Sequence, residues 1–195
     1  MARTQAERSQ ATIGELVEAA RARFSEHGYA GTSIEDVVRE AGVTRGALYH
    51  HFESKSDLFR AVVEAEQEAL TRFILQGSAS RRGAWQRFRT GCHLFLEACL
   101  DPSVRRILLL DGPAVLGWDA IREIEARHTL ALLRDGLGAA AREGRLAHRD
   151  LETLARLLFA TLAEAGRLIA KAPHPRKALA EVVASVDRLL DAARL

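Results

Sequence analysis

The chain has 195 residues, 48% of them hydrophobic and 28% charged, which is enough apolar sequence for one large or two small domains with a buried core. The formal net charge of +2 is close to neutral, so total charge does not point to a nucleic-acid partner. Four prolines and long runs of Ala, Leu, Arg and Glu predict an almost purely helical chain, and runs of β-branched residues are too short to predict a sheet.

No apolar stretch approaches the length that spans a membrane, and the first residues lack the charged start, apolar run and cleavage site of a signal peptide. We therefore expect a cytoplasmic protein with no membrane partner.

An amphipathic helix is predicted from Gln10 to His27, after a polar segment, residues 1–9, that is expected to fray. Its apolar face carries Ile13, Leu16, Val17, Ala20 and Phe24. Gly28 ends this helix, and the apolar face is expected to support the helices that follow.

Two short helices are predicted next, and they meet at an abrupt turn. Ser33 caps the first with Asp36 in capping-box position, and Ile34, Val37, Val38 and Ala41 follow at helical spacing. Gly42 supplies a position where positive φ is cheap, and Thr44 caps the second helix. Two helices joined by a short turn containing glycine are typical of the helix-turn-helix, whose second helix enters the major groove of DNA.

The second helix, Thr44 to Phe52, divides into two faces at about 100° per residue. We assign Thr44, Leu48, His51 and Phe52 to the interior. The outward face consists of Arg45, Gly46, Ala47, Tyr49 and His50. This face suits a groove, because arginine can bind guanine through two hydrogen bonds and alanine can contact a thymine methyl group. A solvated helix face is the alternative explanation.

Further DNA contacts are expected around this helix. Ser54 caps a helix predicted to reach about Leu75, and Lys55 in its first turn is placed to contact a phosphate. Thr32 and Ser33 either contact phosphates or act only as caps, and Thr44 joins them as a candidate. Residues 1–60 carry eight Lys and Arg against nine Asp and Glu, so binding must depend on local placement of Arg3, Arg8, Arg45 and Lys55.

The run from Thr32 to Leu58, TSIEDVVREAGVTRGALYHHFESKSDL, resembles the DNA-binding domain of the TetR family of bacterial transcriptional regulators. Upstream, Ala19, Ala20 and Phe24 before Gly28 and Tyr29 extend the resemblance over about the first quarter to third of the chain. The resemblance implies an all-α fold in which a three-helix DNA-binding domain precedes a helical domain that binds a small-molecule effector and dimerises.

We place the domain boundary between residues 1–55 and 56–195. Residues 76–83, QGSASRRG, form the clearest break in the chain. Further helices are predicted at residues 84–100, 102–110, 117–143, 151–171 and 175–193. Gly136 and Gly138 predict a kink or a close helix crossing within the long segment 117–143.

The last two predicted helices carry apolar faces that one domain of this size has difficulty covering, which predicts helix-on-helix dimerisation. The resemblance implies a four-helix bundle at the same place. Candidate contacts are Leu158, Leu162, Ala165, Ile169, Val182, Val186 and Leu189. Ordinary core packing is the alternative.

Large aromatic residues and isolated polar groups between residues 85 and 159 predict a mainly hydrophobic cavity, in which the resemblance places the effector. The candidate lining residues are Trp85, Phe88, Cys92, Phe95, Cys99, Leu109, Trp118, Ile121, His128 and Phe159. His93, His128 or Glu164 is expected to hold a polar end of the ligand. For each residue, plain core packing is the alternative.

The sequence contains none of the common nucleophile, dinucleotide, phosphate-loop or zinc-protease motifs, so we predict no catalytic residue, cofactor or metal site. His93 and Glu97 share a helix face, but two ligands without a third favour simple polar pairing. Cys92 and Cys99 lie about 10.5 Å apart along one predicted helix, beyond disulfide reach, and are expected to be buried, with a thiol sensor as the alternative.

These features predict a homodimeric, DNA-binding transcriptional regulator, most simply a repressor released from a palindromic operator by a small, largely hydrophobic effector. The rival of another class is a helical small-molecule-binding protein or enzyme whose helix-turn-helix is only structural. A transcriptional activator is a further alternative.

Overall fold

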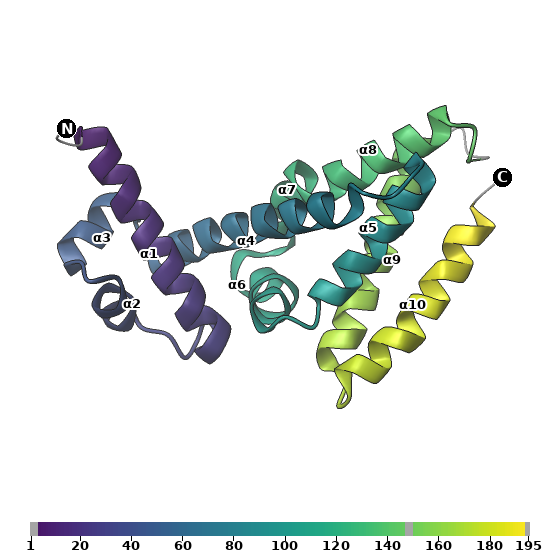
Figure 1. Cartoon of the computed structure of the whole chain (residues 1–195). Helices are drawn as coiled ribbons and strands as arrows, with labels where there is room; N and C mark the ends of the chain where they lie inside the picture. Colours follow the sequence, from purple (N-terminus) through teal and green to yellow (C-terminus); the bar gives the residue numbers. More distant parts are fainter. Residues whose placement is uncertain (1–3, 147–149, 194–195) are drawn as a thin grey trace.

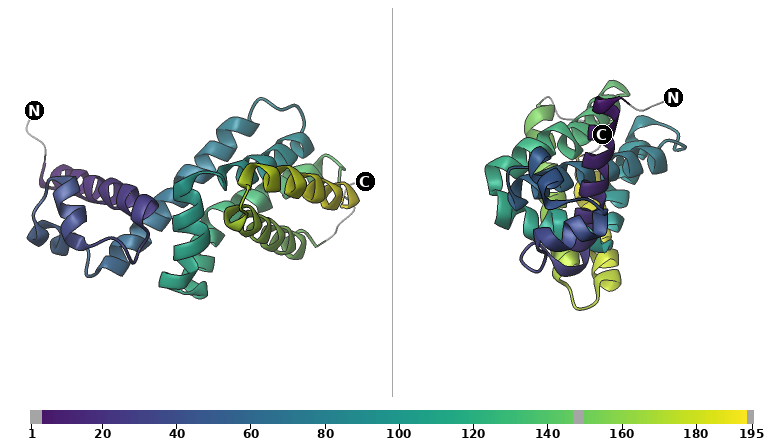
Figure 2. Two further views of the ribbon diagram at one scale, coloured as in Figure 1. Left: turned by 90° about the horizontal axis from the view of Figure 1, so that it is seen from below. Right: turned by 90° about the vertical axis from the view of Figure 1, so that its left-hand side faces the viewer.

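The computed structural model describes residues 4–146 and 150–193, and this part of the chain forms an elongated all-α molecule (Figures 1 and 2). One end consists of α1 (Gln5–His27), α2 (Ile34–Ala41) and α3 (Arg45–His51). The long helix α4 (Lys55–Ser78) connects this end to α5 (Ala84–Ala98), η1 (Val104–Asp111), α6 (Gly112–Leu116), α7 (Trp118–Arg127), α8 (Thr129–Arg142), α9 (Leu151–Lys171) and α10 (Pro175–Ala192). The predicted all-α fold with an N-terminal helix-turn-helix is confirmed.

The first helix begins earlier than predicted. Thr4 and Glu7 form a reciprocal capping box, in which the Thr4 hydroxyl accepts from the Glu7 amide at 3.2 Å and the Glu7 carboxylate accepts from the Thr4 amide at 2.7 Å. Because these bonds satisfy backbone groups at the helix start, residues 5–9 are helical, and the prediction that they fray was wrong. Arg8 therefore lies on α1.

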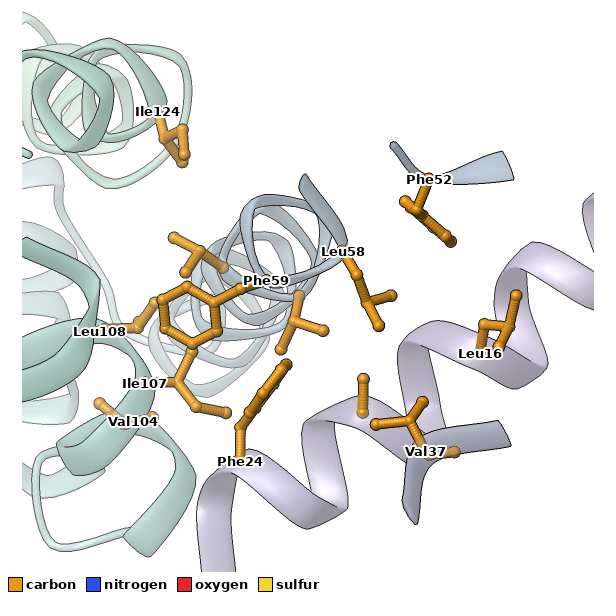
Figure 3. Packing of buried hydrophobic residues seen from close by; sticks show 14 of the residues in the cluster. Leu16, Phe24, Val37, Phe52, Leu58, Phe59, Val104, Ile107, Leu108 and Ile124 are labelled. Carbon is orange, nitrogen blue, oxygen red and sulfur yellow. The ribbon is translucent and has the colours of Figure 1, made fainter. Parts of the chain in front are cut away.

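A continuous apolar core joins the helix-turn-helix to the rest of the molecule (Figure 3). Phe24 of α1 packs edge-on against Phe59 of α4, with ring centroids 5.0 Å apart. The same cluster takes in Ile107 and Leu108 of η1. The N-terminal helices thus share their apolar core with α4 and η1, which lie beyond residue 54.

Polar contacts reinforce this junction. The buried Glu66 of α4 accepts hydrogen bonds from Ser103 at 2.7 Å and from Arg21 of α1 at 3.5 Å. The backbone amide of Tyr29 donates to the Asp111 carboxylate of η1 at 2.8 Å. The chain that follows α5 therefore touches α1 directly.

The segment predicted as a helix over residues 102–110 is a π-helix, η1, which continues into α6 without the predicted break at residues 111–113. Pro113 stands at the start of α6, where a missing amide proton costs nothing. The Gly112 amide donates to the Ile107 carbonyl, five residues back. A Cβ atom on Gly112 would lie 2.8 Å from that carbonyl oxygen, so the wide turn depends on glycine.

The predicted long helix over residues 117–143 is two helices, because His128 leaves helical geometry (φ −118°, ψ −98°). The His128 imidazole pairs with Glu64 of α4 at 2.8 Å, which ties the α7–α8 junction to α4. Gly136 stays inside α8 and marks a close crossing instead, since a Cβ atom there would lie 2.9 Å from the Phe88 ring of α5.

A second apolar cluster lies among α5, α8, α9 and α10 and includes Leu96, Leu137, Ile169 and Leu190. Asp187 of α10 binds Arg89 and His93 of α5, and the Arg89 hydrogen bond is the main cause that lowers the pKa of this carboxyl. Within the described residues, we find no helix that combines the length and the apolar character needed to cross a membrane.

Candidate nucleic-acid interface and internal cavity

The α2–α3 turn has the geometry that the sequence predicted. Gly42 adopts a left-handed conformation (φ 67°, ψ 24°) after α2. Thr44 then caps α3, since its hydroxyl accepts from the Ala47 amide at 3.1 Å. Leu48 is fully buried beneath α3 and fixes which side of the helix faces outward.

The exposed face of α3 carries Arg45, Gly46, Tyr49 and His50, and Ala47 is half-buried at its edge. Thr44 was assigned to the interior, but it is exposed, because its side chain turns to cap the helix end. His51 is half-buried and Phe52 is buried, in line with the interior assignment.

Arg45 is held in place by two neighbours. Its guanidinium group lies 2.6 Å from the Glu35 carboxylate of α2 and 5.4 Å from the centre of the Tyr49 ring. Both partners are exposed, so these contacts are weak in water and can be exchanged for a base edge. Glu35 therefore orients Arg45 without withdrawing it from the surface.

Gly46 is not required by the fold. A Cβ atom at this position would meet only the Thr44 hydroxyl, at 3.9 Å. Since glycine lowers helix stability relative to alanine, its presence on the exposed face fits a close approach by another molecule.

The start of α2 departs from the prediction at Thr32. The Thr32 side chain is 2% exposed and donates to the Gly28 carbonyl at 2.9 Å, so a phosphate contact from this hydroxyl is excluded in this conformation. Ser33 remains exposed and forms the predicted capping box with Asp36. Hydrogen bonds from Ser33 are the main cause that lowers the pKa of the Asp36 carboxyl to about 2.

Lys55 is half-buried rather than exposed. Its ammonium group donates to the carbonyls of Tyr29 at 2.7 Å and Thr32 at 2.8 Å, and lies 4.1 Å from the centre of the Tyr29 ring. Two of its three donors are thus used to hold the α1–α2 loop, and one remains for a phosphate.

A shallow groove of about 570 Å³ separates the start of α1 from the end of α3. Arg8, Ser9 and Thr12 line it from α1, and His50 and His51 line it from α3. These polar groups border the exposed face of α3 and suit a phosphate backbone. Arg3, the other predicted phosphate contact, lies outside the described residues.

A cavity of about 520 Å³ lies among α4, α5, α8 and α9, and mostly apolar side chains form its wall. Phe88, Phe95 and Phe159 contribute aromatic rings. Its polar lining residues are Ser78, Arg87, Thr129 and Asp135, of which Arg87 and Asp135 are exposed and Ser78 and Thr129 are buried.

Four of the candidate ligand residues, Phe88, Cys92, Phe95 and Phe159, lie in the wall of this cavity. The other six candidates, Trp85, Cys99, Leu109, Trp118, Ile121 and His128, are not among the residues described as lining it.

Those six residues have other neighbours. Trp85 is buried against Phe88 with ring centroids 5.7 Å apart, and Ile121 packs in the core near η1. Trp118 is exposed beside Arg167. Cys99 and Leu109 meet at Gly166 of α9, where a Cβ atom would lie 2.9 Å from the Cys99 sulfur.

The polar residues proposed to hold a ligand are paired elsewhere. His93 binds Asp187 and His128 binds Glu64, while the exposed Glu164 binds Arg167 at 2.8 Å. Sequence spacing did not reveal the partners of His93 and His128, because Asp187 and Glu64 come from distant parts of the chain.

Both cysteines are buried, as expected, and burial raises the pKa of each thiol to about 12. They are therefore protonated at neutral pH, which argues against the thiol-sensor alternative. In residues 4–146 and 150–193, no group of three or more His, Cys, Asp or Glu side chains is arranged to hold a metal ion.

Most of the predicted dimer contacts lie inside the core of the chain itself. Leu158, Leu162, Ala165, Ile169 and Val186 are buried there, and Val182 is half-buried. Leu189 is 52% exposed. Leu157 and Leu168, which belong to the predicted apolar face of α9 but not to the candidate contacts, are 62% and 57% exposed. Most of the predicted contacts thus pack in the core, and the outward leucines of α9 and α10 are Leu157, Leu168 and Leu189.

Two family models match the chain. Residues 16–62 match the model described as bacterial regulatory proteins, tetR family, and residues 85–193 match the tetracyclin repressor-like C-terminal domain.

Individual relatives match over most of their length. The solved structure of a TetR-family transcriptional regulator from Pectobacterium atrosepticum is 36% identical with a TM-score of 0.85, covering 99% of this chain and 98% of that one. The HTH-type transcriptional regulator TtgR of Pseudomonas putida is 29% identical over 206 residues, covering 100% of this chain and 97% of that protein.

A second solved structure shares the fold at lower identity. The transcriptional regulator FadR of Bacillus subtilis, solved in complex with stearoyl-CoA, is 18% identical with a TM-score of 0.71, covering 91% of this chain and 96% of that one. The family models, the relatives and the exposed α3 face agree, and the chain belongs to the TetR family of DNA-binding transcriptional regulators.

Proposed function

We propose that this regulator is a homodimeric repressor that binds a palindromic operator and is released from it by a small, largely hydrophobic effector. Residues 1–55 bind DNA, and residues 56–195 bind the effector and the second subunit, in the cytoplasm. The observation that carries the proposal is the exposed face of α3, where Arg45, Tyr49 and His50 surround a glycine that the fold does not need.

DNA recognition is assigned residue by residue. Arg45 and Ala47 read base edges, and Gly46 lets the helix approach the duplex. Tyr49, His50, Ser33, Thr44 and Lys55 contact the phosphate backbone, together with Arg8 from α1. Thr32 acts through its buried hydroxyl as a structural support of the loop.

Dimerisation is supported by the outward leucines of α9 and α10, which lie at the end of the molecule away from α3 (Figure 1). Exposed large apolar side chains grouped on two neighbouring helices favour a helix-packed interface. A twofold dimer presents two copies of α3, which suits half-sites about 34 Å apart on DNA.

Effector release is supported by the position of the cavity. It is lined by Ile74 and Ser78 of α4, and the opposite end of the same helix holds Lys55 against the α1–α2 loop. A ligand that favours one position of α4 shifts the separation of the two α3 helices and so lowers operator affinity. Binding of a small molecule by the FadR relative supports a ligand role for this fold.

An electrophoretic mobility-shift experiment with DNA from upstream of its own gene tests the proposal. Wild-type protein is expected to give a specific, salt-sensitive shift, and Arg45→Ala is expected to weaken it about tenfold or more. The matched control is Arg81→Ala, which removes an exposed arginine in the α4–α5 loop.

Equal binding by Arg45→Ala and wild type would count against α3 as the reading helix. A protein that binds no specific DNA would instead support the rival of a helical ligand carrier. Deletion of the gene for this protein should raise transcription of the genes that the operator controls. A fall in their transcription would indicate an activator.

A further inference from the structure

The cavity wall limits the charge of a ligand, an inference that rests on the proposed effector response. Among the described lining residues, the charged side chains are Arg87 and Asp135, and both residues are exposed to solvent. The buried Cys92 thiol stays neutral, since its pKa is raised to about 12. An ionised group deep in the cavity would therefore lose its water without gaining a counter-charge.

The wall also favours a long, aromatic ligand. The lining residues of α8 extend from Thr129 to Ala139, ten residues and about 15 Å along the helix axis. Phe88, Phe95 and Phe159 surround this space, and aromatic rings pack well against one another in offset or edge-on contact.

The two buried hydroxyl groups in the cavity wall already use their protons within the protein. The Thr129 hydroxyl donates to the Gln67 side-chain oxygen at 3.0 Å, and the Ser78 hydroxyl donates to the Ile74 carbonyl at 2.8 Å. Each hydroxyl has a single proton, so a ligand group that reaches either one meets only lone pairs and must itself donate the hydrogen bond.

Thr129 is better placed than Ser78 to accept that proton. Ser78 also lies 3.4 Å from the Leu75 carbonyl, so its oxygen is held against the backbone of α4 itself. Thr129 is the first residue of α8, and its partner Gln67 lies in the buried middle of α4. A ligand bound to Thr129 is thus connected to α4 through the Thr129–Gln67 hydrogen bond.

We propose that the effector is a neutral aromatic compound bearing a hydroxyl group, a phenol, and that its hydroxyl donates to Thr129 Oγ1 inside the cavity. Thr129 is then the residue that determines effector specificity, and the Thr129–Gln67 hydrogen bond links the bound effector to α4.

Isothermal titration of the full-length protein with three matched probes tests this. The probes are 4-phenylphenol, its methyl ether 4-methoxybiphenyl, and biphenyl-4-carboxylate. We expect the phenol to bind about tenfold more tightly than the ether, which cannot donate, and also more tightly than the carboxylate, which is charged.

Substitutions in the cavity wall test which residue accepts the hydrogen bond from the phenol. Thr129→Val removes the acceptor at similar volume and should lower the affinity for the phenol to that for the ether, while Thr129→Ser should keep the preference. Ser78→Ala is the control and should leave the ratio of the two affinities unchanged. The probe series in the wild-type protein remains decisive even if Thr129→Val fails to fold.

If the probes bind, the proposal is overturned by equal binding of phenol and ether, by tightest binding of the carboxylate, or by a preference that survives Thr129→Val. Tight carboxylate binding would assign the site to an amphipathic anion held by Arg87. If no probe binds while operator DNA is still shifted, this inference fails and the DNA-binding proposal stands. If the phenol is preferred but no DNA is bound, the DNA-binding proposal fails and the inference about the effector stands.

Discussion

Glu125 on α7 is a carboxylate whose protonation should affect the stability of the fold. Burial raises the pKa of its carboxyl from 4.5 to about 7, and the nearby Arg167 and Arg122 offset only part of that rise. Between pH 4.5 and 7 the folded state therefore binds more protons than the unfolded state, so the free energy of unfolding falls as pH rises through this window.

The variant Glu125→Gln is expected to remove this pH dependence. It should be more stable than wild type at pH 8, by on the order of 1–3 kcal/mol, with a difference that shrinks as pH falls toward 4.5. Urea unfolding at several pH values measures it. Glu123→Gln is the control, because hydrogen bonds from Arg60 and Arg127 lower the pKa of that exposed carboxyl and no gain is expected at pH 8. A constant difference between Glu125→Gln and wild type at all pH values would contradict the assignment.

Site residues were predictable where their partners are close in sequence. The caps at Ser33, Thr44 and Ser54 each bind an amide three residues ahead, and the sequence placed all three. Lys55 and His128 behave differently, because their partners lie 23 or more residues away and only the tertiary fold brings them together. Aromatic character alone also did not separate Phe88 in the cavity wall from Trp118 on the surface.

At the scale of elements, the wide turn at the end of η1 depends on a single residue, Gly112. A Cβ atom on Gly112 would meet the Ile107 carbonyl oxygen at 2.8 Å and the Ile121 side chain at 3.2 Å, and a backbone carbonyl cannot move aside cheaply. Gly112→Ala is therefore expected to destabilise the protein by about 1–3 kcal/mol, measured by urea unfolding.

Gly14→Ala is the matched control for this substitution. Gly14 lies within α1, and a methyl group added there would meet nothing within 4 Å, so alanine should stabilise the helix by up to about 1 kcal/mol. If Gly112→Ala were as stable as Gly14→Ala, the wide turn would not require glycine.

Helix types and ends were predictable to different degrees. Amphipathic spacing placed α9 at Leu151–Lys171 as observed, since a long buried face and clear end signals agree. The Thr4–Glu7 capping box was present in the sequence and extends α1, but it precedes the apolar spacing that indicated a helix. The π-helix and the break at His128 coincide with long-range contacts, from Asp111 to Tyr29 and from His128 to Glu64, which local spacing does not encode.

At the scale of the whole molecule, the outward leucines should control both assembly and DNA binding. The double substitution Leu157→Glu and Leu168→Glu places charges on the exposed face of α9 and is expected to convert the proposed dimer to monomers. Sedimentation velocity measures the mass, and operator affinity should fall at least tenfold, because a monomer reads only one half-site.

Phe73→Glu is the control, since Phe73 is 45% exposed on α4. It should leave the dimer intact. A wild-type protein that sediments as a monomer, or a doubly substituted protein that remains a dimer, would remove α9 from the interface.

The shared core around Phe24 and Phe59 has a practical consequence for protein engineering. A chimera that borrows only residues 1–55 would leave Leu16, Phe24 and Val37 without the apolar partners that α4 and η1 supply. A chimera that retains this packing would also need α4 and apolar side chains equivalent to Ile107 and Leu108. With α3 in its proposed role, operator specificity is therefore better exchanged by substituting the exposed residues of α3 than by moving the segment that contains it.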